Sequence, residues 1–246
     1  MVMTKERASG KEQKLAELVE QLQKAFGDRL VSVVLYGSGS TDDWNQDSSD
    51  LNVLCVVSRI SSDELRSAQP ILHWWQQKGN PPPLLLTADE VRTSTDCFPM
   101  EFHDMHQHRR ILLGADVIED LAIDDKFYRA EVEHELRAKQ LRLRQRAAEV
   151  LSDPEPLLRL MTDSISTFCV LGRHALVLGG NAPPWDKHDV INALRDALAS
   201  PFDAFGEILT IRTSGRRNGG LDTVQLLDRY LGDIELLVRF VDTLGQ

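Results

Sequence analysis

The sequence predicts an α+β protein in which a mixed sheet with flanking helices is followed by an all-α helical bundle. Short apolar runs rich in β-branched residues, which are typical of strands, occur in the first half of the chain. After Gly114, apolar residues recur almost everywhere at helical spacing. We therefore expect one domain over residues 1–120 and a second over 121–246.

The first domain contains all the predicted strands. The run 30–36 is too short for a helix and stops at Gly37, so it predicts a buried strand. The helical pattern before it ends at Gly27. Alternation of apolar and polar residues over 98–102 predicts a further strand. Together the predicted strands are 30–36, 51–57, 84–86 and 98–102, and the predicted helices are 15–26 and 62–78.

The second domain is expected to be a helical bundle. Prolines and glycines interrupt its helical pattern at intervals and mark the ends of the predicted helices. These helices are expected over 124–151, 155–178, 187–198, 202–212 and 222–244.

The composition excludes some classes of partner. The chain has 246 residues and a formal net charge of −10, from 28 Lys and Arg against 38 Asp and Glu. Such a balance argues against duplex nucleic acid or an anionic membrane, because both bind a net basic face. No apolar run of transmembrane length occurs, and the first residues are polar. We therefore expect a cytoplasmic protein whose cysteines stay reduced.

The candidate chemistry lies between the first two predicted strands. Gly37 and Ser38 follow the first strand, and Asp50 and Asn52 stand at the start of the second. Because side chains alternate along a strand, Asp50 and Asn52 point to one side and their apolar neighbours to the other. Gly37 permits close approach of the backbone, and Ser38 offers a hydroxyl and an amide to a phosphate. This arrangement is suited to holding a polyphosphate through a metal ion.

This segment resembles the signature of the nucleotidyltransferase superfamily. Residues 35–57 carry its Gly-Ser turn, followed on the next strand by Asp50-Leu51-Asn52 where the family has Asp-x-Asp. Downstream segments are also similar to the aminoglycoside nucleotidyltransferases and related small bacterial enzymes, and the resemblance covers most of the chain. These segments are 98–105, 108–109, 113–114 and 133–144.

The resemblance implies a Mg²⁺-dependent transfer of a nucleoside monophosphate from a nucleoside triphosphate to a hydroxyl of a small molecule. In that family, two carboxylates on one strand and a third on a neighbouring strand hold the metal ions. Mapped onto this chain, Gly37 and Ser38 contact the triphosphate, whereas Asp50, Asn52 and Glu101 bind Mg²⁺. Asp50 and Glu101 are the implied catalytic residues, and the helical domain is expected to shape the acceptor pocket.

Asn52 departs from the family pattern, which has a carboxylate at this position. An amide supplies one neutral oxygen, so the affinity for a second Mg²⁺ is expected to fall. Either one metal ion suffices, or another acid such as Asp47 compensates, or transferase activity is lost. The last case defines an alternative function, in which a degenerate fold binds nucleotide or a protein partner as a regulatory or antitoxin-like module.

Glu101 is the predicted third carboxylate. On a strand over 98–102 it faces away from Met100 and Phe102, which point into the core. There it can bind metal or accept the proton of the acceptor hydroxyl. Asp104 is the competing choice if the strand bulges or its register slips by one residue.

Overall fold

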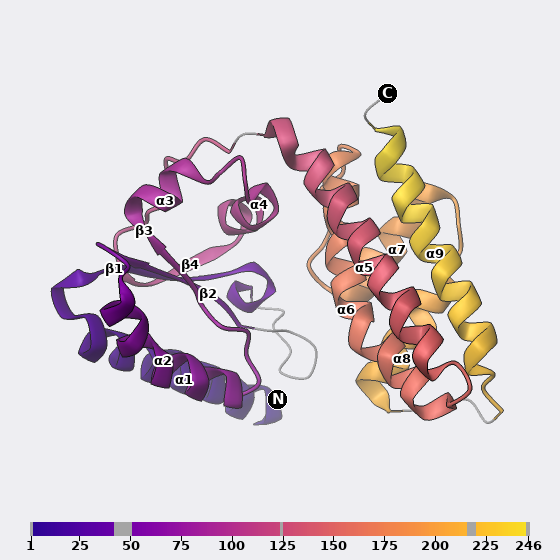
Figure 1. The fold of residues 1–246 in the computed structure, drawn as a ribbon, viewed down its shortest axis with the longest axis horizontal. Helices are drawn as coiled ribbons and strands as arrows, with labels where there is room; N and C mark the ends of the chain where they lie inside the picture. Colours follow the sequence, from indigo (N-terminus) through magenta and orange to yellow (C-terminus); the bar gives the residue numbers. More distant parts are fainter. Residues whose placement is uncertain (1, 42–50, 124, 216–219, 245–246) are drawn as a thin grey trace. The chain divides into compact units, whose positions relative to one another are not determined.

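The computed structural model describes residues 2–41, 51–123, 125–215 and 220–244. The chain divides into two compact units, Met1–Asp124 and Asp125–Gln246. The first unit contains the described strands, and the second is helical (Figure 1). None of the described helices is both long enough and apolar enough to cross a membrane. The predicted fold class, a mixed sheet with flanking helices followed by an all-α part, is confirmed.

The strands form one mixed sheet in the order β3-β2-β1-β4. β1 runs antiparallel to β2 and to β4, whereas β3 runs parallel to β2. The end of β1 therefore lies beside the start of β2, with Tyr36 opposite Asn52. The strands are β1 (Leu30–Tyr36), β2 (Asn52–Val57), β3 (Leu84–Thr87) and β4 (Arg109–Gly114).

Helices cover both faces of the sheet (Figure 1). α1 (Val2–Phe26) and α2 (Ser62–Gln77) pack on one face, and α3 (Ala88–Thr93) and α4 (Pro99–Gln107) pack on the other. Side chains of β2 alternate between these two cores, since Val53 belongs to the first and Leu54 to the second. Asn52 therefore points to the α4 side, away from Leu51 and Val53, as the alternation predicts.

The strand predicted over 98–102 is wrong, because α4 begins at Pro99 and contains the rest of this segment. Pro99 occupies the start of the helix, where its fixed φ and missing N–H are tolerated. Pro99, Phe102 and Met105 are buried at three-residue spacing, which is a helical stripe and not the alternation of a strand. The remaining strand of the sheet is β4, which opens with Arg109 and Arg110.

The second unit is built around α6. This helix packs against α5, α7, α8 and α9. Its Phe168 makes ring contacts with Phe205 of α8 and Tyr230 of α9, so aromatic side chains fill the centre of the unit. The predicted helices of this region are all present. They are α5 (Tyr128–Val150), α6 (Pro154–Leu178), α7 (Lys187–Leu198), α8 (Asp203–Ser214) and α9 (Thr223–Thr243).

Candidate functional site

A tight turn follows β1, as a short 3₁₀ helix over Gly37–Ser40. Gly37 has a φ of +69°, in the left-handed region that side chains rarely adopt. Its backbone N–H donates to the carbonyl oxygen of His108 at 3.0 Å, which ties the turn to the end of α4. Ser40 donates its hydroxyl to the Gly37 carbonyl at 2.8 Å. Because the Gly37 N–H is already used, Ser38 is the better phosphate ligand of the two predicted residues.

Three residues with polar side chains lie at this end of β1. Tyr36 ends the strand, Ser38 lies in the turn, and Asn52 lies opposite Tyr36. Within the described ranges, none of these three side chains forms a hydrogen bond. Tyr36 is only 8% exposed, and Ser38 and Asn52 are half-buried. Polar groups without a partner among the described residues can bind a polar ligand, so this corner is suited to one.

α4 brings two carboxylates to the same corner. Phe102 and Met105 pack with Tyr36 in the core beneath the helix. Glu101 and Asp104 lie beside them, one helical turn apart. Burial raises the pKa of the Tyr36 phenol, and the negative charges of Glu101 and then Asp104 raise it further. Both carboxylates therefore act on this phenol.

The family resemblance assigned Ser38, Asn52 and Glu101 to one site. The structure has Ser38 in the turn after β1, Asn52 at the start of β2, and Glu101 on α4, which packs against that turn. Asp50 and the alternative acid Asp47 belong to 42–50, outside the described residues. Glu101 comes from a helix, so its expected place on a neighbouring strand is wrong. None of the strands β1 to β4 carries an acidic residue.

Sequence reasoning missed Tyr36. Its one signal was a phenol at the end of an apolar run, directly before the Gly-Ser turn. Tyr36 was interpreted as a core residue of the predicted strand, because tyrosine is common in strands.

The donor chemistry of this corner fits Mg²⁺. Asn52 and Glu101 offer oxygen atoms, which Mg²⁺ prefers over nitrogen and sulfur. The described residues do not complete a metal site by themselves, since no three of their His, Cys, Asp or Glu side chains could hold an ion together. Asp50 would have to contribute from outside this part of the chain.

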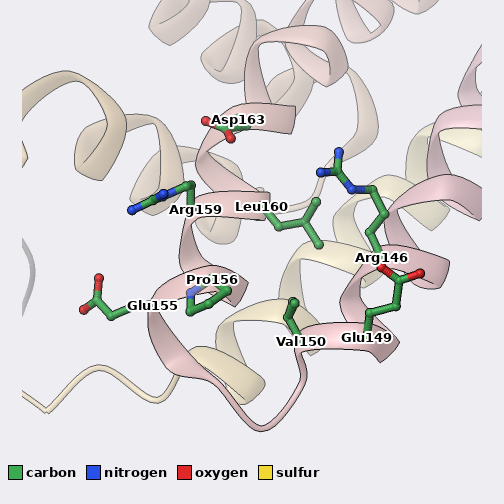
Figure 2. A pocket seen from close by; sticks show the side chains of 8 residues that line it. All are labelled: Arg146, Glu149, Val150, Glu155, Pro156, Arg159, Leu160 and Asp163. Atoms are coloured by element: carbon green, nitrogen blue, oxygen red, sulfur yellow. The ribbon is translucent and has the colours of Figure 1, made fainter.

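A surface pocket of about 330 Å³ lies in the second unit, between α5 and α6. In Figure 2, charged side chains from both helices surround Leu160 and Val150. The charged side chains of the pocket are exposed, and none of the predicted site residues lines it. The lining residues are Arg146, Glu149, Val150, Glu155, Pro156, Arg159, Leu160 and Asp163.

Comparison with known proteins identifies the fold. No protein-family model and no curated protein sequence matches the chain. Its structure is similar to the crystal structure of spectinomycin adenyltransferase AAD(9) from Enterococcus faecialis, which contains ATP and spectinomycin. The TM-score is 0.59 at 15% sequence identity, over 91% of this chain and 99% of that chain. At this identity the likeness establishes a shared fold, and the chain has a nucleotidyltransferase-like architecture.

Proposed function

We propose that the chain is a nucleotidyltransferase that transfers a nucleoside monophosphate from a nucleoside triphosphate to a hydroxyl of a small molecule. The observation that supports the proposal is a fold similar to that of an adenyltransferase, with Ser38 in the turn after β1, Asn52 at the start of β2 and Glu101 on α4. The site lies beside a turn whose backbone permits close approach, at Gly37. A cytoplasmic location belongs to the same proposal.

Each group at the corner has a chemical role in this reaction. Ser38 donates its hydroxyl to the triphosphate, and Gly37 leaves room for the phosphate beside the backbone. Glu101 accepts the proton of the acceptor hydroxyl while its oxygen attacks the α-phosphorus. Asp50, Asn52 and Glu101 are the residues that would hold Mg²⁺. When bound, this ion neutralises the charge of the phosphates.

Transfer of label from α-³²P-ATP in the presence of Mg²⁺ tests the proposal. Spectinomycin, present in the similar crystal structure, and a panel of hydroxyl-bearing antibiotics are the acceptors to try first. We expect Asp50→Ala and Glu101→Gln to lower transfer by about 100-fold or more. Glu119→Gln, which removes an exposed acid of the same unit, should transfer at the wild-type rate. The proposal fails if the wild-type protein binds no triphosphate at millimolar nucleotide.

A second candidate is a regulatory or antitoxin-like module that binds nucleotide without transferring it. One observation favours it: the amide of Asn52 stands where the family has a carboxylate. In that case the wild-type protein binds ATP, yet labels no acceptor and releases no pyrophosphate.

A further inference from the structure

The phenol of Tyr36 is a polar group of this corner that the roles above leave unused. Its ring is packed in the core beneath α4, and the side chain is only 8% exposed. The hydroxyl forms no hydrogen bond within the described ranges. It lies beside the turn at Gly37 and opposite Asn52. Among the described residues this donor has no partner, so a ligand can supply its acceptor.

The neighbours of the phenol determine which ligand group suits it. A neutral phenol donates a hydrogen bond, and the carboxylates of Glu101 and Asp104, whose charges act on it, accept one. An alcohol satisfies both, because its oxygen accepts from Tyr36 while its proton is donated to a carboxylate. An amine has a single lone pair, which its attack on phosphorus uses, so it cannot also accept from the phenol. A phosphate oxygen has no proton to donate to a carboxylate.

We propose that Tyr36 binds the oxygen of the attacking hydroxyl and so makes the site selective for alcohols over amines. This inference rests on the proposed nucleotidyl transfer. The acceptor proton moves to Glu101 and its oxygen forms a bond to the α-phosphorus. The bond from that phosphorus to the bridging oxygen breaks, and pyrophosphate leaves with the electron pair. The phenol hydrogen bond stabilises the negative charge that develops on the attacking oxygen.

Water is the simplest hydroxyl probe, since its attack on ATP gives AMP and pyrophosphate. We expect Tyr36→Phe to lower kcat for this hydrolysis by about 10- to 100-fold. The KM for ATP should stay within about twofold, because the phenol contacts the attacking group and not the triphosphate. Methylamine at pH 9 is the second probe. In Tyr36→Phe the ratio of AMP-methylamide to AMP should rise, which a general loss of packing would not cause.

Tyr230→Phe is the matched control. It also removes a buried phenol hydroxyl, but one in the second unit that lies 3.0 Å from the Ser164 hydroxyl. Its kcat and product ratio should equal those of the wild type. Thermal melting of both variants verifies folding, and loss of the Tyr36 hydroxyl leaves the ring packing intact.

The outcomes separate this inference from the proposed function. If Tyr36→Phe hydrolyses ATP at the wild-type rate with the wild-type product ratio, the role of Tyr36 is refuted while nucleotidyl transfer stands. If the wild-type protein binds ATP but releases no pyrophosphate with any probe, both proposals fall together. A lower kcat of Tyr36→Phe together with a larger fraction of AMP-methylamide supports both proposals.

Discussion

Asp233 of α9 accepts a hydrogen bond from the backbone N–H of Phe205 in α8, at 3.3 Å. The carboxyl group is buried at the start of α8, and burial raises its pKa to about 6. Hydrogen bonds from the backbone N–H groups of Phe205 and Ala204 lower the pKa of Asp233, but by less than burial raises it. The folded protein therefore holds an acid whose charged form is disfavoured.

This arrangement predicts a pH-dependent effect of Asp233→Asn on stability. The unfolded pKa of an aspartate is about 3.9, so folding raises it. Because the folded pKa is raised, the contribution of Asp233 to the free energy of unfolding is complete below about pH 4. This contribution is lost as the pH rises through about 6. Asp233→Asn, which keeps an acceptor oxygen, should melt at a higher temperature than the wild type at pH 8. Thermal melting from pH 4 to pH 8 should show this advantage shrinking toward pH 4. A constant difference across that range would contradict the assignment.

Gly114 ends β4 in close contact with β1. Its φ is +77°, and a Cβ atom there would lie 2.1 Å from the backbone carbonyl oxygen of Val31. Gly114→Ala should therefore destabilise the protein by at least the cost of the left-handed conformation, about 1–3 kcal/mol. Urea unfolding measures this change. Gly79→Ala is the control, because Gly79 has a φ of +83° but nothing within 4 Å of the added atom. Equal losses in the two variants would show that the contact with Val31 is unimportant.

His174 of α6 is buried between two partners, and their chemistry predicts its tautomer. Its Nε2 lies 3.2 Å from Nη2 of Arg173, and its Nδ1 lies 2.7 Å from the hydroxyl of Tyr128. A guanidinium only donates, so Nε2 must accept and the ring is neutral with its proton on Nδ1. The guanidinium also stacks on Trp185, at 3.9 Å from the ring centroid. Long-range ¹H–¹⁵N NMR spectra at pH 7 should show an unprotonated Nε2. A protonated Nε2 would contradict the Arg173 hydrogen bond.

The local patterns predicted most of the fold, and the failure at α4 has a physical reason. β1 and β2 are apolar runs bounded by polar residues, so their ends follow from the sequence. At 98–102 a two-residue alternation coincided with the start of a helical stripe, and Pro99 marked the helix start. The sequence pattern did not predict β4, because this strand begins with two charged residues. Arg109 pairs with Asp116 and Arg110 with Glu12, which lets a charged segment join the sheet.

The candidate site was predictable only where it follows strand geometry. Ser38 follows β1, and Asn52 begins β2. In an antiparallel pair the end of one strand lies beside the start of the next, so the sequence predicted both residues at one corner. The position of Glu101 depended on tertiary packing, since α4 comes from a distant segment of the chain and packs on one face of the sheet. Tyr36 could be recognised as a site residue only after the helix and its carboxylates were placed beside it.

Substitution of Asn52 tests the effect of an added negative charge at this corner. Asn52→Asp adds a negative charge on the side of the sheet that already holds Glu101 and Asp104. Without divalent cations the variant should melt below the wild type, because the carboxylates repel one another. Added Mg²⁺ should raise its melting temperature more than that of the wild type. A tenfold gain in affinity is worth about 1.4 kcal/mol, or about 3–6 °C for a chain of this size.

Asn80→Asp controls for the added charge, because Asn80 is another half-buried asparagine of the same unit. Its melting temperature should respond to Mg²⁺ as the wild type does. An identical Mg²⁺ response in Asn52→Asp would remove Asn52 from the metal site. Transfer activity of Asn52→Asp then separates the two proposed functions. A large gain indicates a decayed transferase that the carboxylate restores. A loss indicates that the amide belongs to a working site, because the lower charge of that site is then part of its chemistry.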